Sequence, residues 1–241
     1  MFFAPPGKLK RLGVVGLNQR NGDYISKLNR RSDYPKVDNK LITKQLAVSA
    51  GIAVPELYAV VETNHDAQRL ASLLAPYQDF VIKPAHGSGG EGIVVVDGRQ
   101  GKLFRKASGQ LVTLASLEHH VGNILSGMYS LGGQPDHAMI EYRVRFDPLF
   151  KDITFQGVPD IRTIVFKGYP VMAMVRLPTR TSDGKANLHQ GAVGAGINIA
   201  TGVTHHGVFN SLKIDHHPDT GHPIGGHAIP QWDVLLRLAA G

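Results

Sequence analysis

The residues best suited to do chemistry lie between Asp79 and Val96, in the sequence DFVIKPAHGSGGEGIVVV. This pattern predicts a strand that ends near Lys83, a loop with four glycines in six residues, and a second strand. Glycine has no Cβ, so backbone N–H groups in such a loop can approach an anion closely. The lysine places a positive charge beside the same anion. The segment therefore predicts a site for nucleotide phosphates.

The glycines at 87–92 spell G-x-G-x-x-G, a string that several classes of protein share. A dinucleotide-binding fold needs a helix after the last glycine and an acidic residue about 20 positions later. Here a β-branched run at 93–96 favours a strand, and no acidic residue occurs within 98–117. A protein kinase has its lysine after the glycines and carries HRD and DFG motifs, which are absent. An ordinary glycine-rich hairpin and a hairpin that covers a nucleotide triphosphate both remain open.

The composition is that of an ordinary globular chain of 241 residues, long enough for one or two domains. It contains no cysteine, which excludes disulfides, thiolate catalysis and cysteine metal sites. The sequence has no apolar run long enough for a membrane span and no signal-peptide pattern at its start, so we expect a cytoplasmic protein. The net charge of +7 suits an anionic ligand. Nucleic acid is not an expected partner, because no ladder of aromatic and basic residues is visible.

The local patterns predict an alternation of helices and strands in three ranges. Residues 1–37 form an N-terminal arm and first strand, residues 38–136 a first part with a glycine-rich lid at about 79–130, and residues 137–241 a second part. Helices are expected at 38–50, 66–74 and 113–125 and from about 231, and strands near 102–105, 138–144, 161–166 and 171–175, with a loop-rich stretch from 178 to 230.

Taken in order, the motifs VDNK, GIAVP, DFVIKPAHGSGGEGI, MIEYRV, VPDIR, VMAMVRL and ANLHQG resemble those of the ATP-grasp ligases. More narrowly, the chain resembles the RimK-related alpha-L-glutamate ligase-like proteins, from about Leu12 to its end. The resemblance implies an α+β fold in which two subdomains grip ATP between them. It also implies a carboxylate–amine ligase, in which ATP phosphorylates a carboxylate and an amine attacks the acyl phosphate to form an amide.

The resemblance assigns the ATP contacts. Lys40 and Lys83 match the two ATP-contacting lysines of the family, and the loop between the strands covers the phosphates. The segment 139–144 matches the stretch that holds adenine, although a plain buried strand would read the same way. The residues expected to bind ATP are Lys40, Lys83, His86, Gly87, Ser88, Gly89, Gly90, Gly92, Glu141, Tyr142 and Val144.

Three residues match catalytic positions of the family. Arg176 is expected near the γ-phosphate or the acyl phosphate, and Asn187 near the triphosphate. Arg162 either faces the substrate or forms an ion pair with Asp160. His189 and Arg20 are expected to face the substrate. The alternative for His189 is that it caps its own loop.

The expected cofactors are ATP and Mg²⁺, but no metal ligand is expected within this chain. In the family, an aspartate and an E-x-N motif hold magnesium downstream of a helix that begins here near Trp232, so these groups and the final metal-binding strands are expected beyond Gly241. The alternative function is therefore a nucleotide-binding pseudoenzyme or an inactive fragment. The expected partners are an amino acid such as glutamate and a peptide or protein acceptor, without a membrane, and a homo-oligomer is possible.

Overall fold

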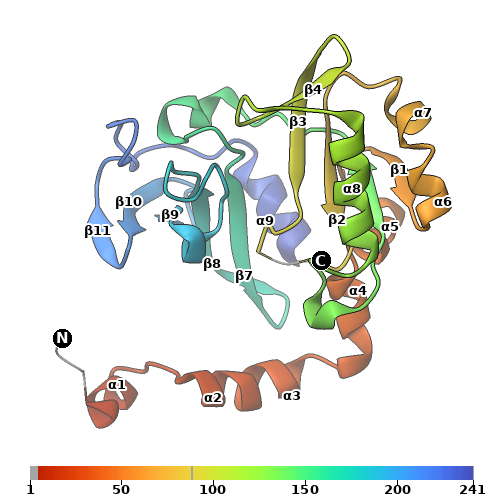
Figure 1. The fold of residues 1–241 in the computed structure, drawn as a ribbon. Helices are drawn as coiled ribbons and strands as arrows, with labels where there is room; N and C mark the ends of the chain where they lie inside the picture. Colours follow the sequence, from red (N-terminus) through yellow and green to blue (C-terminus); the bar gives the residue numbers. More distant parts are fainter. Residues whose placement is uncertain (1–4, 88, 241) are drawn as a thin grey trace.

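The computed structural model describes residues 5–87 and 89–240 as an α+β protein built on two antiparallel sheets (Figure 1). The first sheet has the strand order β1-β6-β2-β3-β4-β5, and the second has the order β11-β10-β9-β8-β7. Each sheet has its own cluster of buried apolar side chains. The predicted fold class, with two α+β halves, is confirmed.

The first sheet is covered on one face by short helices (Figure 1). Its central strands alternate: Phe80 and Ile82 are buried among apolar side chains of the helices, while Lys83 points to the opposite face. The elements are β1 (Leu57–Val61), α6 (Asn64–Ala67), α7 (Leu70–Leu74), β2 (Phe80–Pro84), β3 (Val94–Gln100), β4 (Leu103–Lys106), β5 (Leu111–Val112), α8 (Leu114–Leu125), η3 (Leu131–Gly133) and β6 (Ala138–Glu141).

The predicted lysine-bearing strand, glycine loop and second strand are confirmed, because β2 pairs antiparallel with β3 on either side of the loop. The predicted Thr113 cap of α8 is also confirmed, since its hydroxyl accepts the N–H of Ser116 at 3.2 Å. The single helix predicted at 66–74 is instead divided into α6 and α7. The break lies at Arg69, whose φ and ψ of −94° and 7° are not helical.

The strand β6 lies in the first sheet, between β1 and β2. Its residues Ala138 and Ile140 are fully buried in the core of that sheet. The first half of the fold therefore extends to Glu141 and does not end at the boundary expected after residue 136. An isolated apolar strand of four residues carries no signal in the sequence for which sheet it will join, because pairing is decided by the tertiary fold.

The second sheet packs against α9, whose Trp232 lies in the core and donates its indole N–H to the carbonyl of Ile199 at 2.9 Å. The predicted hairpin near 161–175 and the last helix are confirmed. The elements are η4 (Pro148–Ile153), β7 (Asp160–Phe166), β8 (Tyr169–Leu177), η5 (Leu188–Gln190), β9 (Val193–Ile197), β10 (Thr204–Phe209), β11 (Leu212–Ile214) and α9 (Trp232–Ala240).

The stretch expected to be loop-rich in fact contains β9, β10 and β11. In β9 the sequence VGAGI buries Val193, Ala195 and Ile197 on one face and places glycines on the other. The alternation is that of a strand, but the glycines lower the strand propensity of the segment. Packing of the three apolar side chains against the core overrides that propensity.

The N-terminal arm is helical and contains no strand within the described residues, so the expected first strand is wrong. Gly13 has a φ of +76°, which turns the chain inside the apolar run 12–17, and no neighbouring strand is available to pair with it. The arm runs below the two sheets as a separate ribbon (Figure 1). Its elements are α1 (Pro6–Arg11), α2 (Leu17–Gln19), the π-helical η1 (Arg20–Ile25), α3 (Ser26–Leu28), η2 (Arg31–Asp33) and α4 (Tyr34–Asp38).

Within the described residues, no helix has the length and apolar character needed to cross a bilayer.

One buried histidine makes the stability of the second half depend on pH. His217 is 1% exposed; its Nε2 donates to the carbonyl of Pro178 at 3.0 Å, and its Nδ1 accepts the N–H of Asp219 at 3.3 Å. Burial lowers the pKa of His217, and the hydrogen bond to the carbonyl of Pro178 and the charge of Asp219 offset this only in part. The ring therefore stays neutral in the folded protein at a pH where it is protonated in the unfolded chain.

We predict that the free energy of unfolding falls as the pH is lowered from about 7.5 to 5.5, because the unfolded chain binds a proton near its ordinary histidine pKa of about 6.5 and the folded chain does not. The slope contributed by one group cannot exceed about 1.4 kcal/mol per pH unit. Urea unfolding at several pH values should show a smaller slope for His217→Gln than for the wild type. Equal slopes in the two proteins would contradict this assignment.

Candidate functional site

The helix α5 (Lys40–Ser49) carries two lysines toward the first sheet. The side chain of Asn39 caps this helix by accepting the N–H groups of Leu41 at 2.9 Å and Ile42 at 3.3 Å. Lys40 and Lys44 are four residues apart and therefore lie on the same face of the helix. The ammonium group of Lys40 donates to the carbonyl of Ala85 at 3.3 Å and to that of Gly87, at the start of the glycine loop.

A third lysine joins this group through a buried carboxylate. Lys83 in β2 and Glu141 in β6 are diagonal neighbours on one face of the sheet, because Lys83 lies opposite Met139. Glu141 is 4% exposed; its Oε1 forms an ion pair with Lys83 and its Oε2 lies 3.1 Å from the Nζ of Lys44. The site therefore brings together three ammonium groups and one carboxylate that contacts two of them.

The pKa of Lys40 is lowered by burial and by the positive charge beside it. Burial of the ammonium group is the largest cause, the charge of Lys83 adds to it, and the carboxylates of Asp136 and Glu141 act in the opposite direction. An anion bound near these side chains would relieve the repulsion between the lysines. The electrostatics of the site thus favour a ligand with several negative charges.

The first end of the glycine loop is held by Asp136, which the sequence analysis did not single out. This buried carboxylate accepts the backbone N–H of His86 at 2.9 and 3.1 Å and the ring Nδ1–H of His86 at 2.7 Å. It also accepts the hydroxyl of Ser130 at 2.9 Å and the N–H of His137 at 2.7 Å. Burial alone would raise the pKa of Asp136, but these hydrogen bonds outweigh it, and the pKa lies below its ordinary value.

The second end of the loop is held by residues that follow α8 or lie within it. The carbonyl of Gly92 accepts the Nε2–H of His120 at 2.9 Å. Gly92 has a φ of +71°, and a Cβ at this position would lie 2.6 Å from the ring of Tyr129. Both ends of the loop are therefore attached to the segment 120–136. Sequence reasoning missed this segment because its polar residues are scattered and match no motif.

The tip of the loop contacts the second half of the protein. The side-chain amide of Asn187 donates to the carbonyl of Gly89 at 3.1 Å, and its oxygen accepts the N–H of His189 at 3.0 Å. The aliphatic part of Lys185 lies beside Gly90. Asn187 was expected near the triphosphate; it lies at the tip of the loop, with both ends of its amide hydrogen-bonded to protein. Lys185 adds a cation that the sequence analysis did not include.

Of the two alternatives for Arg162, the ion pair with Asp160 is not formed. The carboxylate of Asp160 pairs with the guanidinium of Arg176, with Nε to Oδ1 at 2.6 Å and a second contact to the other oxygen, and not with Arg162. The register explains this, since Asp160 lies directly opposite Arg176 on the neighbouring strand, while Arg162 lies opposite Met174. Arg162 is exposed. A phosphate contact from Arg176 would have to share this arginine with Asp160.

The remaining predicted residues that the structure describes do not line the cavity under the glycine loop. Tyr142 donates its backbone N–H to the carbonyl of Glu56 at 2.8 Å, and Val144 is exposed in the segment that leads to the second sheet. His189 is exposed in η5 and is capped by Asn187, so the loop cap is Asn187 and not His189. Arg20 is exposed in the arm. Ser88 lies outside the described residues.

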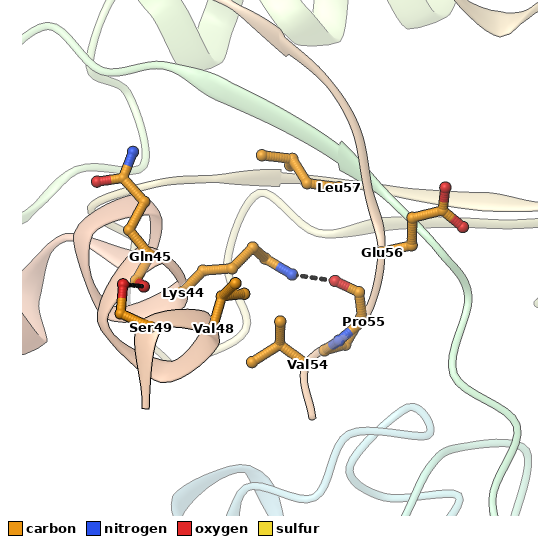
Figure 2. A pocket seen from close by; sticks show the side chains of 8 residues that line it. All are labelled: Lys44, Gln45, Val48, Ser49, Val54, Pro55, Glu56 and Leu57. Atoms are coloured by element: carbon orange, nitrogen blue, oxygen red, sulfur yellow. Dashed lines mark hydrogen bonds between the residues drawn. The ribbon is translucent and has the colours of Figure 1, made fainter. Parts of the chain in front are cut away.

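Two cavities lie near the lysines. The smaller, of about 80 Å³, lies under the glycine loop and is lined by Lys40, Lys83, Pro84, Gly87, Gly89, Gly90, Glu91 and Ile93. The larger, of about 520 Å³, lies between α5 and the start of β1 and is lined mainly by aliphatic groups. Figure 2 shows Lys44 at the wall of the larger cavity, where its ammonium group donates to the carbonyl of Pro55. We take the smaller cavity as the chemical site, because the cations and the loop backbone converge there.

Comparison with known families identifies the family of this chain. Residues 19–241 match the model of the family described as "Sugar-transfer associated ATP-grasp". Because the match covers most of the chain, this protein belongs to that family and to the ATP-grasp superfamily, whose members bind ATP and are generally enzymes that form bonds. A search of curated proteins found no match.

Among residues 5–87 and 89–240, no group of three or more His, Cys, Asp or Glu side chains is arranged to hold a metal ion. Glu141 is paired with two lysines and Asp160 with Arg176, while Glu91 lines the cavity under the loop. We therefore derive no step through a metal ion.

The close approach of Gly92 to Tyr129 gives a direct test of how the loop is held. We predict that Gly92→Ala lowers the free energy of unfolding by about 1–3 kcal/mol, because the added Cβ meets the ring and the positive φ is strained for alanine. Gly122→Ala is the matched control: Gly122 lies inside α8 with open space around it, so alanine there should stabilise by up to about 1 kcal/mol. Urea unfolding measures both, and a Gly92→Ala protein as stable as wild type would contradict the packing described.

Proposed function

We propose that this protein is an ATP-dependent carboxylate–amine ligase that binds the phosphates of ATP under the glycine loop. The observation that carries this proposal is the convergence of Lys40, Lys83 and the loop glycines Gly87, Gly89 and Gly90 on one cavity, in a chain that belongs to an ATP-grasp family. Phosphoryl transfer needs positioning and neutralisation of charge more than covalent participation by the protein. A loop held at both ends beside paired lysines is suited to that task.

The reaction has two balanced steps. The carboxylate oxygen of one substrate attacks the γ-phosphorus of ATP, so that a C–O–P linkage forms, the bond to the β-phosphate oxygen breaks, and ADP leaves. The amine of the second substrate then attacks the acyl carbon, phosphate leaves, and the amine loses one proton. The products are an amide, ADP and phosphate.

The residues divide this work according to where they lie. Lys40 and Lys83 line the cavity under the loop and would neutralise the phosphates. Lys185 and Asn187 approach the tip of the loop from the second half, so a nucleotide there would contact both halves. Adenine would lie beside the segment that follows Glu141, using backbone groups other than the N–H of Tyr142, which is bonded to Glu56. Magnesium would help neutralise the phosphates when bound.

Two kinds of acceptor substrate are consistent with this function. The resemblance to glutamate ligase-like proteins supports an amino acid such as glutamate as one substrate and a peptide or protein as the acceptor. The family description, "Sugar-transfer associated", supports an acceptor linked to sugar transfer as the alternative. In the arm, Arg20, Arg30 and Arg31 are exposed and would suit an acidic substrate.

The acyl phosphate can be trapped, and this tests the function. With ATP, Mg²⁺, hydroxylamine and a panel of carboxylic acids that includes glutamate, we predict carboxylate-dependent formation of a hydroxamate together with an equal amount of ADP. Lys83→Ala should lower the rate by about tenfold or more, because it removes a charged contact worth about 1.5–3 kcal/mol. The matched control is Lys102→Ala, an exposed lysine in the turn between β3 and β4.

Each outcome of this experiment is informative. ADP formation without hydroxamate would contradict the acyl-phosphate route. Nucleotide binding with neither product would favour the alternative, a nucleotide-binding protein without turnover. A rate unchanged by Lys83→Ala would contradict the assignment of the phosphate site.

A further inference from the structure

We infer that Lys44 is a positioning residue that holds the charge of Glu141, so that Lys83 can leave this carboxylate and bind a phosphate. No motif pointed to Lys44, and its only sequence signal is its spacing of four residues from Lys40 on α5. The inference rests on the proposed function, because it concerns how the same site accepts the phosphates of ATP.

The three side chains form a buried, charged group. The exposed fractions of the side chains alone are 11% for Lys44, 6% for Glu141 and 20% for Lys83. A carboxylate this far from water must keep a cationic partner, since an unpaired buried charge is strongly destabilising. Glu141 has two such partners in the structure, one on each oxygen.

The two lysines differ in what else they touch. Lys83 lines the cavity under the glycine loop, where phosphates are proposed to bind. Lys44 lines the other cavity and is anchored by a further hydrogen bond to the carbonyl of Pro55 (Figure 2). Lys83 is therefore the partner that can turn toward a phosphate, and Lys44 is the partner that stays with Glu141.

Removal of Lys44 should weaken nucleotide binding. Glu141 would then depend on Lys83 alone, and movement of Lys83 to a phosphate would leave a buried carboxylate unpaired. Nucleotide binding would have to overcome that cost, so affinity should fall although Lys44 touches no nucleotide. If Glu141 is neutral as well, Lys83 is no longer held, and affinity should return.

The experiment is a double-mutant cycle on the full chain, read out by calorimetric titration with the non-hydrolysable ATP analogue AMP-PNP and Mg²⁺. Lys44→Met should weaken binding by about tenfold, within the usual range of coupling between sites. The double variant Lys44→Met with Glu141→Gln should bind within about threefold of Glu141→Gln alone, because the penalty exists only when Glu141 is charged. Lys102→Met is the matched control and should bind as the wild type does.

A merely structural role for Lys44 would not give this recovery. If the double variant binds as weakly as Lys44→Met, or if Lys44→Met binds normally, the inference is overturned. Should Lys44→Met fail to fold, Lys44→Arg, which keeps the charge, must retain wild-type affinity and the double variant must still bind; failure of either also overturns it.

The titration of Lys83→Ala separates this inference from the function on which it rests. Weaker binding by Lys83→Ala together with normal binding by Lys44→Met would contradict the role of Lys44 but not the phosphate site. Unchanged binding by Lys83→Ala would contradict both the role of Lys44 and the phosphate site.

Discussion

A carboxylate removed from water must be neutralised or fully hydrogen-bonded, and the site of this protein depends on that constraint at two places. Glu141 forms ion pairs with two lysines on the face of the first sheet that carries Lys83. Asp136 accepts the backbone and ring N–H groups of His86 at the start of the glycine loop. The first carboxylate fixes where the cations lie, and the second fixes where the loop begins. The cavity lined by Lys40, Lys83 and the loop glycines is therefore the place where an anion would be stabilised.

The two halves of the fold contribute unequal parts of this site. The first sheet and α5 supply Lys40 and Lys83 and hold both ends of the loop, so the phosphate site belongs mainly to one half. The second half reaches the loop tip through Asn187. The cavity under the loop is lined by residues of the first half alone, so a ligand that also reached the second half would do so at the loop tip, beside Asn187.

The sequence predicts the glycine hairpin, the capped helix α8 and the β7–β8 hairpin, because each is encoded locally by periodicity and turn residues. It does not reveal β9, whose glycines mask a strand pattern, or the sheet that β6 joins, because these depend on distant packing. Among the site residues, Lys40 and Lys83 carry motif signals. Asp136 and Lys44 act through contacts across 50 and 97 residues of sequence, and no local pattern shows such contacts.

We propose that ATP binds between the two halves with its phosphates under the glycine loop. Hydrogen–deuterium exchange of the backbone amides, measured with and without saturating AMP-PNP and Mg²⁺, tests it most directly. We expect slower exchange in two segments at once, the loop at 86–92 and the turn at 187–190, because both would contact the same phosphates. Unchanged exchange in these two segments, or protection confined to other parts of the chain, would contradict it.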